Sequence, residues 1–332
     1  MFPTMTGLFS TDARELLDAD GHKLFAAFAD ANRLRELRHG RSINLCSIAN
    51  ARSGACDQDC AFCAQSSRAT APVDAYGLLP ADEIVSAAQR AMENGAVRFS
   101  IVTSGGALRR GRDLDTVLVA IQWIVEKTGL DVCASLGCVS RDTLEDLKAA
   151  GLTRYHHNME AAASFWPSVC TTRPYDEQRR VVRDAKAAGL EVCSGGVFGM
   201  GESLDQRIEL LDELRDLDVD AVALNFFTPI PGTPFGDVVP ISSLACLRIV
   251  VAARLMMPRR DIRLCGGRER NGRDLQAMLI LGGASGMMIG GYLTTPGRPP
   301  AEDLAMIRDL GLVPDDVPAG RETFTIEPPS SR

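Results

Sequence analysis

Short apolar segments alternate with longer amphipathic segments along most of the chain, and this alternation leaves few folds open to it. The short segments have the length and composition of buried strands, whereas the segments between them carry apolar residues at helical spacing. Eight strands are predicted, at 42–48, 97–103, 131–135, 154–158, 191–196, 221–226, 261–265 and 286–290.

Two of the intervening segments show where helices are expected to begin and end. In 80–96, Asp82 is expected to cap the first turn and Gly95 to end the helix. In 176–190, an acidic start is followed by a stop at Gly189. No linker rich in Pro, Gly or Ser interrupts the alternation, so we predict a closed (β/α)8 barrel of the TIM type rather than two domains.

The barrel is expected to span residues 41–314 of the 332-residue chain. Residues 1–40 are expected to form an N-terminal helical extension. The polar, proline-containing segment 315–332 is expected to be a disordered tail, because it has too little apolar surface to bury.

Charge and targeting signals narrow the class of partner. The chain has 36 basic and 43 acidic residues, a formal net charge of -7 and no long basic run, which disfavours nucleic acid and favours a small-molecule substrate. The start lacks a basic segment followed by an apolar one, and no apolar stretch is long enough to span a membrane. We therefore expect a cytoplasmic protein. In that reducing compartment, the ten cysteines favour metal ligation and catalysis over disulfides.

Three cysteines, Cys56, Cys60 and Cys63, lie in "SGACDQDCAFCAQSS" (53–67) with the spacing C-x3-C-x2-C. The segment follows the first predicted strand, so it is expected at the carboxyl end of the barrel, where such folds place their chemistry. Three thiolates can hold three corners of an iron-sulfur cubane and leave one iron open. Zinc is the alternative, but structural zinc sites use four ligands, usually in C-x2-C pairs.

With Phe62 before the last cysteine, this loop resembles the radical S-adenosylmethionine (SAM) superfamily. In that superfamily the motif holds a [4Fe-4S] cluster whose open iron is chelated by the amino and carboxylate groups of SAM. Further segments resemble the biotin synthase family over residues 42–314: "YHHNME" (155–160), "TTRPY" (171–175), "VCSGGVFGMGE" (192–202), "LNFFTPIPGTP" (224–234), "ARLMMP" (253–258) and "RLCGGRE" (263–269).

The resemblance implies a SAM site and a substrate site. Asn158 and Glu160 are implied near the SAM ribose and Arg173 near its carboxylate, although Arg173 could instead be a solvated arginine at a helix start. Asn225 is implied to bind the ureido ring of dethiobiotin, or else to cap a loop. The full implied SAM set is Phe62, Ser104, Gly105, Asn158, Glu160 and Arg173, with Asn158 and Asn225 toward the substrate.

Two sequence patterns resemble a phosphate-binding loop and a metal-binding histidine pair, but neither is expected to be one. "GMGE" (199–202) is not followed by the remainder of a phosphate-binding loop. The adjacent His156 and His157 would face opposite sides of a strand, so they cannot hold one ion, and a packing or hydrogen-bonding role is expected.

The resemblance also implies an auxiliary [2Fe-2S] cluster deep in the barrel, held by three cysteines and one arginine from four strands. Cys133 and Cys193 match two of these cysteines and Arg263 matches the arginine. The third cysteine, expected on the second strand, is replaced by Ser100, and a hydroxyl is a poor substitute for a thiolate at a soft metal site.

Two further cysteines, Cys46 and Cys265, fall on the first and seventh predicted strands. Arg263 and Cys265 are two residues apart, so both side chains face the same side of the strand. Alternate barrel strands contribute the side chains of one interior layer, so Cys46, Cys133, Cys193 and Cys265 are predicted to share a layer and hold a four-thiolate auxiliary cluster, [2Fe-2S] or larger. Arg263 is then a neighbour or a further ligand. The alternative is four buried cysteines used for packing. Three others are treated as structural: Cys138, Cys170 and Cys246.

The activity implied by the resemblance is sulfur insertion into dethiobiotin to make biotin, with SAM-derived 5'-deoxyadenosyl radicals. It implies an electron donor such as flavodoxin or ferredoxin, and a homodimer. One alternative is another radical SAM barrel enzyme, such as a hydrogenase-cofactor maturase or a methylornithine synthase, which would not need the four-thiolate layer. A second is a non-catalytic iron-sulfur or zinc protein, which would not need Asn158, Glu160 and Arg173.

Overall fold

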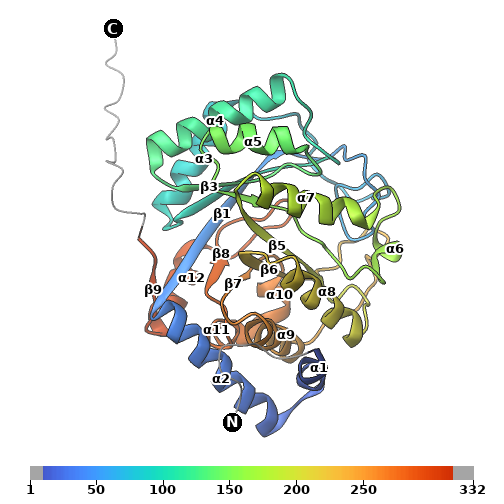
Figure 1. The fold of residues 1–332 in the computed structure, drawn as a ribbon, viewed down its shortest axis with the longest axis vertical. Coiled ribbons are helices and arrows are strands. Elements are labelled where there is room, and N and C mark those ends of the chain that lie inside the picture. The colour runs from blue at the N-terminus through green and yellow to red at the C-terminus, as the bar shows by residue number, and fades with distance from the viewer. Residues whose placement is uncertain (1–9, 317–332) are drawn as a thin grey trace.

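The computed structural model describes residues 10–316, and eight parallel strands in it close into a barrel, with β1 paired to both β8 and β2 (Figure 1). This confirms the predicted fold class. The strands are β1 (Ser42–Arg52), β2 (Arg98–Thr103), β3 (Asp131–Ser135), β4 (Arg154–His156), β5 (Glu191–Phe198), β6 (Ala221–Phe226), β7 (Asp261–Leu264) and β8 (Gly286–Met288). A ninth short strand, β9 (Val313–Pro314), pairs with the start of β1.

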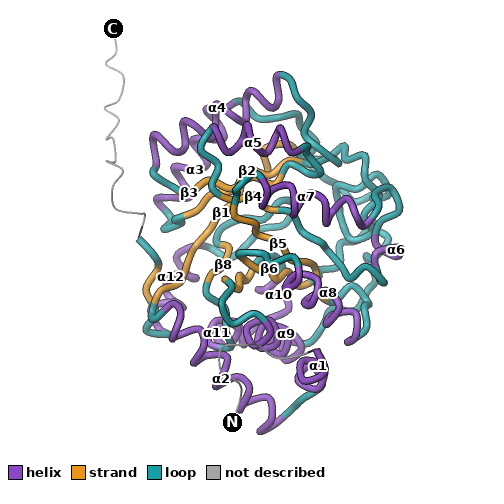
Figure 2. The backbone as a smooth tube through the Cα atoms, in the orientation of Figure 1, coloured by secondary structure: helices purple, strands orange, loops and turns teal. Residues whose placement is uncertain are grey.

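Helices surround the strands on the outside (Figure 2). They are α3 (Ala81–Glu93), α4 (Arg112–Thr128), α5 (Arg141–Ala149), α6 (Trp166–Val169), α7 (Tyr175–Ala187), α8 (Leu204–Asp216), α9 (Ser243–Met256), α10 (Arg268–Gly272), the 3-10 helix η1 (Arg273–Leu275), α11 (Gln276–Leu281) and α12 (Pro300–Asp309).

Two helices precede the barrel: α1 (Ser10–Asp18) and α2 (Gly21–His39). Both pack on α9, and α1 also contacts α8. His39, the last residue of α2, lies 3.7 Å from Asp261 at the start of β7 (Nε2 to Oδ1), so α2 ends beside the amino ends of the strands. Of the expected tail, 317–332 lies outside the described residues, as do residues 1–9 of the expected extension.

The predicted helix ends need one correction. Helix α3 begins at Ala81 after Pro80, so Asp82 lies in the first turn and makes no cap; there its negative charge favours the helix dipole instead. Gly95 and Gly189 follow the ends of α3 and α7 in left-handed conformations (φ of +88° and +76°), as predicted for helix stops.

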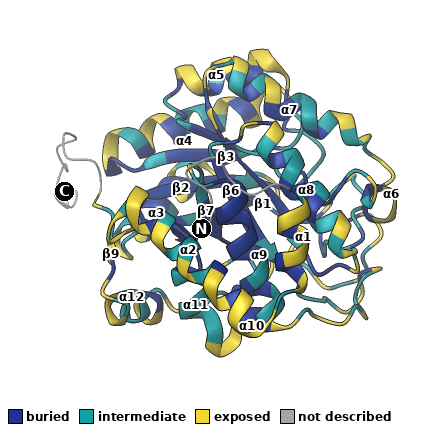
Figure 3. Ribbon diagram, turned by 60° about the horizontal axis from the view of Figure 1, so that its bottom comes forward, coloured by how far each residue is buried: buried dark blue, intermediate teal, exposed yellow. Residues whose placement is uncertain are grey.

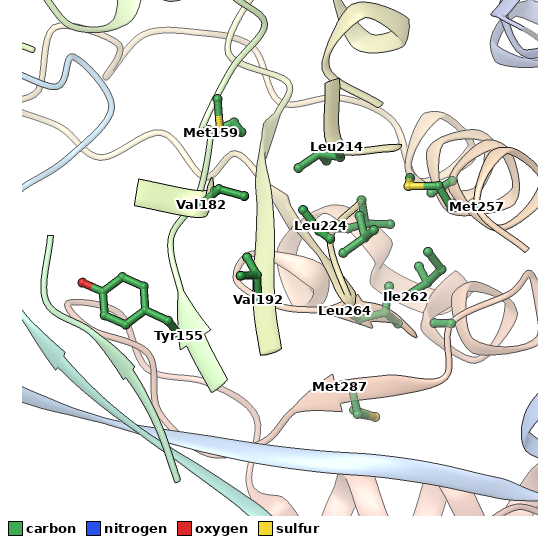
Figure 4. Close-up of a cluster of buried hydrophobic side chains, with 14 of the residues drawn as sticks. Tyr155, Met159, Val182, Val192, Leu214, Leu224, Met257, Ile262, Leu264 and Met287 are labelled. Atoms are coloured by element: carbon green, nitrogen blue, oxygen red, sulfur yellow. The ribbon is translucent and has the colours of Figure 1, made fainter. Parts of the chain in front are cut away.

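The apolar core lies between the strands and the helices rather than inside the barrel. Tyr155, Val192 and Leu224 point outward from β4, β5 and β6 and pack in this core (Figure 4). Buried residues concentrate on the strands and inner helix faces, whereas the outer helix faces are exposed (Figure 3). Because side chains alternate along a strand, the residues next to these apolar ones point into the barrel, where polar groups and cysteines gather.

The register of the strands decides which inward side chains share one height. In a tilted eight-stranded barrel, alternate strands contribute one layer, and each hydrogen-bonded step to the next strand is offset by one residue. Cys46 on β1 pairs with Arg98 on β2, and Arg98 pairs with Asp131 on β3. These two steps add an offset of two residues, so the residue of β3 that is level with Cys46 is Cys133. The same steps around the barrel lead to Cys193 and Arg263, and return to Cys46.

The predicted single layer of four cysteines is therefore wrong in one member. Cys46, Cys133, Cys193 and Arg263 share a layer, and Cys265 lies two residues further along, one layer nearer the carboxyl end. Cys265 still faces the interior, where it packs with Cys193 and Ala223.

Candidate active site

A cavity of about 330 Å³ connects the cysteine layer with the loops that follow the strands. It brings together residues from nearly every strand, including most of the predicted site. Its lining includes Cys46, Cys63, Cys133, Cys193, Cys265, Arg263, Phe62, Asn158, Glu160 and Asn225. Five predicted residues lie beside this cavity and do not line it: Cys56, Cys60, Ser104, Gly105 and Arg173.

The loop that carries Cys56, Cys60 and Cys63 is held by a buried glutamine. The side-chain oxygen of Gln65 accepts a hydrogen bond from the backbone N–H of Gly54 at 2.7 Å, and the backbone N–H of Cys56 donates to the carbonyl of Gln65 at 3.3 Å. These bonds fold the loop back on itself directly after β1. In the part of the chain that the structure describes, no group of three or more His, Cys, Asp or Glu side chains is placed so that it could hold a single metal ion.

The turn after β2 ties to this loop rather than to the cavity. The Ser104 hydroxyl donates to the carbonyl of Gly54 at 2.8 Å, and the backbone N–H of Gly106 donates to a carboxylate oxygen of Asp57 at 2.7 Å. Gly105 between them has a φ of +107°, which suits glycine. The turn therefore positions the cysteine loop.

A second clamp joins the loop to the segment before α7. The Asp59 carboxylate accepts hydrogen bonds from the backbone N–H groups of Thr171 at 2.8 Å and Thr172 at 3.1 Å, and it pairs with Arg68. Burial disfavours the charge on Asp59, but these hydrogen bonds outweigh it, and the pKa of Asp59 lies well below its usual value.

Arg173 is packed into the site rather than solvated. Its guanidinium lies over the ring of Trp166, 5.5 Å from the ring centre, and donates to Cys138 Sγ at 3.8 Å. Its Nε atom is buried and has no hydrogen-bond partner among the described residues. A buried donor without a protein partner is costly, so this N–H is available to a ligand acceptor.

Asn158 and Glu160 stand next to Arg173 at the cavity wall. The Asn158 side-chain N–H donates to Glu160 Oε2 at 3.2 Å, which leaves the buried Asn158 Oδ1 without a partner in the described part of the chain. Burial raises the pKa of Glu160, and the positive charge of Arg173 opposes the rise. Glu160 has a φ of +63°, a strained conformation for a residue with a side chain, as is found at functional sites.

Asn225 is already engaged by the backbone. Its side-chain N–H donates to the carbonyl of Gly196 at 3.2 Å, and its oxygen accepts from the N–H of Gly266 at 3.0 Å. Asn225 therefore ties β5 and β6 to the segment after β7. One N–H and one oxygen lone pair remain for a ligand in the cavity.

Three arginines surround the interior thiols. Arg98 on β2 donates to Cys133 Sγ at 3.6 Å and forms an ion pair with Asp131 at 2.9 Å. Arg154 on β4 forms an ion pair with Glu191 at 2.7 Å. Burial opposes the charge on Arg263, but Cys46 and Cys193 favour it, and its pKa is raised. The thiols thus face positive charge, which favours anionic ligands at this depth.

Sequence reasoning missed Arg98, Arg154 and His156, which all line the cavity. The period-two rule could have found them, because each is two residues from another inward position on β2 or β4. His156 pairs in register with Cys193, and burial lowers its pKa, so its ring is neutral and offers one donor and one acceptor. His157 faces the other way and bonds Gln178 at 2.6 Å, which agrees with the prediction that the two histidines cannot share an ion.

Comparison with known proteins places this arrangement in a family. Residues 51–229 match the radical SAM superfamily, and residues 223–313 match the biotin and thiamin synthesis associated domain. The chain is 47% identical to the biotin synthase of Geobacter sulfurreducens over 301 residues, 91% of this chain and 92% of that protein. It is 46% identical to the biotin synthase of Trichlorobacter lovleyi over 304 residues, 92% of this chain and 91% of the relative.

Solved structures share the fold. A methylornithine synthase superposes with a TM-score of 0.82 at 21% identity, covering 94% of this chain and 95% of its own. An FeFe-hydrogenase maturase from Carboxydothermus hydrogenoformans superposes with a TM-score of 0.77 at 20% identity, covering 93% and 76%. Within residues 10–316, no helix is long and apolar enough to cross a membrane. Because the biotin synthases match over nearly the whole chain and both family models fall on the barrel, this chain belongs to the biotin synthase family of the radical SAM superfamily.

Proposed function

We propose that the chain makes biotin from dethiobiotin by inserting sulfur at unactivated carbons. The observation that carries the proposal is a shared cavity: three of the residues implied for SAM, Phe62, Asn158 and Glu160, line the same cavity as the interior cysteines. A substrate held between them would reach both, and no pair of acid and base residues is needed because C–H bonds of this kind offer them no acidic proton.

The residues present fit the groups that this reaction requires. Cys56, Cys60 and Cys63 would hold the [4Fe-4S] cluster, and the unpaired Arg173 Nε and Asn158 Oδ1 suit the polar groups of SAM. When bound, the cluster with SAM supplies a 5'-deoxyadenosyl radical and the auxiliary cluster supplies sulfur. One electron is needed for each SAM cleaved, which suits a donor such as flavodoxin or ferredoxin.

The interior offers two ligand sets for the auxiliary cluster. Cys46, Cys133 and Cys193 are common to both, and the fourth ligand is either Arg263 in the same layer or Cys265 one layer above. We favour Cys265, because a thiolate is the softer ligand and Arg263 already donates to Asn44 Oδ1 at 2.7 Å. Arg263 then offsets the negative charge of the thiolates.

The substrate would lie between these groups. The neutral ring of His156 and the free N–H and lone pair of Asn225 face the cavity and suit a cyclic urea, which both donates and accepts hydrogen bonds. The rest of the chain excludes water from this space through the closed apolar layer around the barrel.

The test is anaerobic reconstitution of the full chain with iron and sulfide. Iron and sulfide counts with Mössbauer spectra should show two distinct clusters, and incubation with SAM, dethiobiotin and a reductant should give 5'-deoxyadenosine and biotin. Formation of 5'-deoxyadenosine with dethiobiotin left unconsumed would refute the proposed substrate. A protein that takes up only the cluster of the loop would refute the auxiliary site.

A further inference from the structure

Cys170 has no part in the proposed reaction, yet it lies directly opposite Cys60. The backbone N–H of Ala61 donates to the carbonyl of Val169 at 2.8 Å, and on the other side of Cys60 the N–H of Thr171 donates to the Asp59 carboxylate at 2.8 Å. Residues 59–61 and 169–171 therefore run side by side in opposite directions, with Cys60 and Cys170 in the middle of each.

This placement brings the two sulfurs together. The side chains of Cys60 and Cys170 belong to the same apolar cluster beside Trp166. Disulfides form between cysteines of neighbouring segments whose Cα atoms are about 4.4–6.8 Å apart. Hydrogen bonds on both sides of the pair hold the two segments together, and this places the two thiols as neighbours for a disulfide.

Access differs between the two thiols. Cys170 is buried, with 2% of its surface exposed, whereas Cys60 is only partly buried. The pair is therefore reached from the Cys60 side.

We propose that Cys60 and Cys170 form a reversible disulfide when the loop carries no cluster, and that this bond blocks cluster assembly until a thiol reductant opens it. The blocking role rests on the proposed function, in which Cys60 is a cluster ligand; the disulfide itself does not. Two S–H bonds break and one S–S bond forms. The two electrons and two protons reduce a low-molecular-weight disulfide to two thiols.

The test uses the full chain, stripped of iron by a chelator under reducing conditions and then exposed anaerobically to oxidised glutathione. After alkylation and trypsin digestion, the expected product links the peptides 53–68 and 155–179, with fragment spectra that place the bond between Cys60 and Cys170. The link should persist in Cys63→Ser and disappear in Cys170→Ser.

Iron uptake tests the blocking role. Oxidised wild-type protein should fail to load the loop while still loading the interior cysteines, and dithiothreitol should restore the loop. Cys170→Ser should load the loop whether or not it was oxidised, whereas Cys246→Ser, a change at a buried cysteine of α9, should behave like wild type.

Two results would overturn the inference. Absence of the link, or pairing of Cys60 with Cys56 or Cys63 in its place, refutes the disulfide. A link that leaves iron uptake unchanged refutes the block. Both readouts are made without substrate, so a failure of the proposed function would show only in the product assay.

Discussion

Arg263 and Cys265 are two residues apart and face the same interior, yet they lie at different depths of the barrel. Arg263 is level with Cys46, Cys133 and Cys193, whereas Cys265 lies nearer the carboxyl end. The identity of the fourth ligand therefore depends on whether the auxiliary cluster is confined to one layer or reaches up to the next.

Cys265→Ser tests this directly. We expect the variant to lose the auxiliary cluster and make little or no biotin while it still cleaves SAM, because the cysteines of the loop are untouched. Cys46→Ser should behave alike, and Ser100→Cys should be nearly silent if the second strand supplies no ligand. Iron and sulfide counts with 5'-deoxyadenosine and biotin assays give the answer. Full cluster content in Cys265→Ser but not in Cys46→Ser would assign the fourth position to Arg263.

Asn225→Ala separates a structural role from a binding role. The loss of the side chain removes its hydrogen bonds to the Gly196 carbonyl and the Gly266 N–H, so the free energy of unfolding should fall by about 1–3 kcal/mol. Dethiobiotin should also bind more weakly by a similar amount, while SAM affinity stays near wild type. Denaturant unfolding and calorimetric titration measure the two effects. Unchanged dethiobiotin affinity would leave Asn225 as a loop tie alone.

Strand β5 must approach β6 very closely, which depends on a glycine. A Cβ atom added to Gly195 would lie 1.8 Å from the carbonyl oxygen of Ala223, while the carbonyl of Gly195 accepts from the N–H of Met159 at 2.9 Å. The glycine thus allows β4, β5 and β6 to place their inward residues around the cavity.

Gly195→Ala should therefore destabilise the barrel by about 3 kcal/mol, the upper end for an overpacked site. Gly77→Ala is the control, because nothing lies within 4 Å of the added carbon there. Thermal unfolding of the two variants beside wild type measures the difference. An equal melting temperature in both variants would show that the strands can separate without loss.

Helix α2 ends at a histidine that should make stability depend on pH. Burial lowers the pKa of His39 to about 4, more than the charge of Asp261 raises it. The folded protein thus resists a proton that the unfolded chain accepts near its usual pKa of about 6.5. The contribution of His39 to the free energy of unfolding is therefore complete above about pH 6.5 and is lost as the pH falls toward about 4. By pH 5 the free energy of unfolding should have fallen by about 2 kcal/mol.

His39→Gln removes this dependence. Between pH 7.5 and pH 5 the variant should lose less stability than wild type, measured as the change in urea unfolding free energy. The same slope in both proteins would mean that His39 takes up its proton when folded, as an exposed histidine does.

The molecule keeps its two proposed iron sites in separate parts. Cys56, Cys60 and Cys63 lie on the loop after β1, which is held by hydrogen bonds of its own Asp59 and Gln65. The other proposed ligands, Cys46, Cys133, Cys193 and Cys265, lie inside the barrel. Loss of iron from one site should therefore leave the iron of the other site in place.

Cys60→Ala should abolish SAM cleavage, because two thiolates cannot hold the cluster of the loop, but the interior iron should remain. Iron content and 5'-deoxyadenosine formation after reconstitution are the measurements. If 5'-deoxyadenosine forms at the wild-type rate, Cys60 is no cluster ligand. A loss of all iron would instead mean that the interior site depends on the loop.

Local pattern was sufficient for the architecture. Period-two and helical spacing predicted all eight barrel strands, with ends that differ by a few residues, as at 154–158 against the observed Arg154–His156. The spacing of Cys56, Cys60 and Cys63 likewise carries their chemistry within one loop. These features follow from neighbours along the chain, so they can be read there.

Tertiary structure alone decided which distant residues meet. The depth of Cys265 follows from the stagger of the strands around the closed barrel, a property of pairings between strands that no single segment contains. The opposition of Cys60 to Cys170 likewise depends on how the loop after β1 packs on the segment before α7. Local spacing sets the direction of each side chain, but its neighbours across the barrel are set only when the sheet closes.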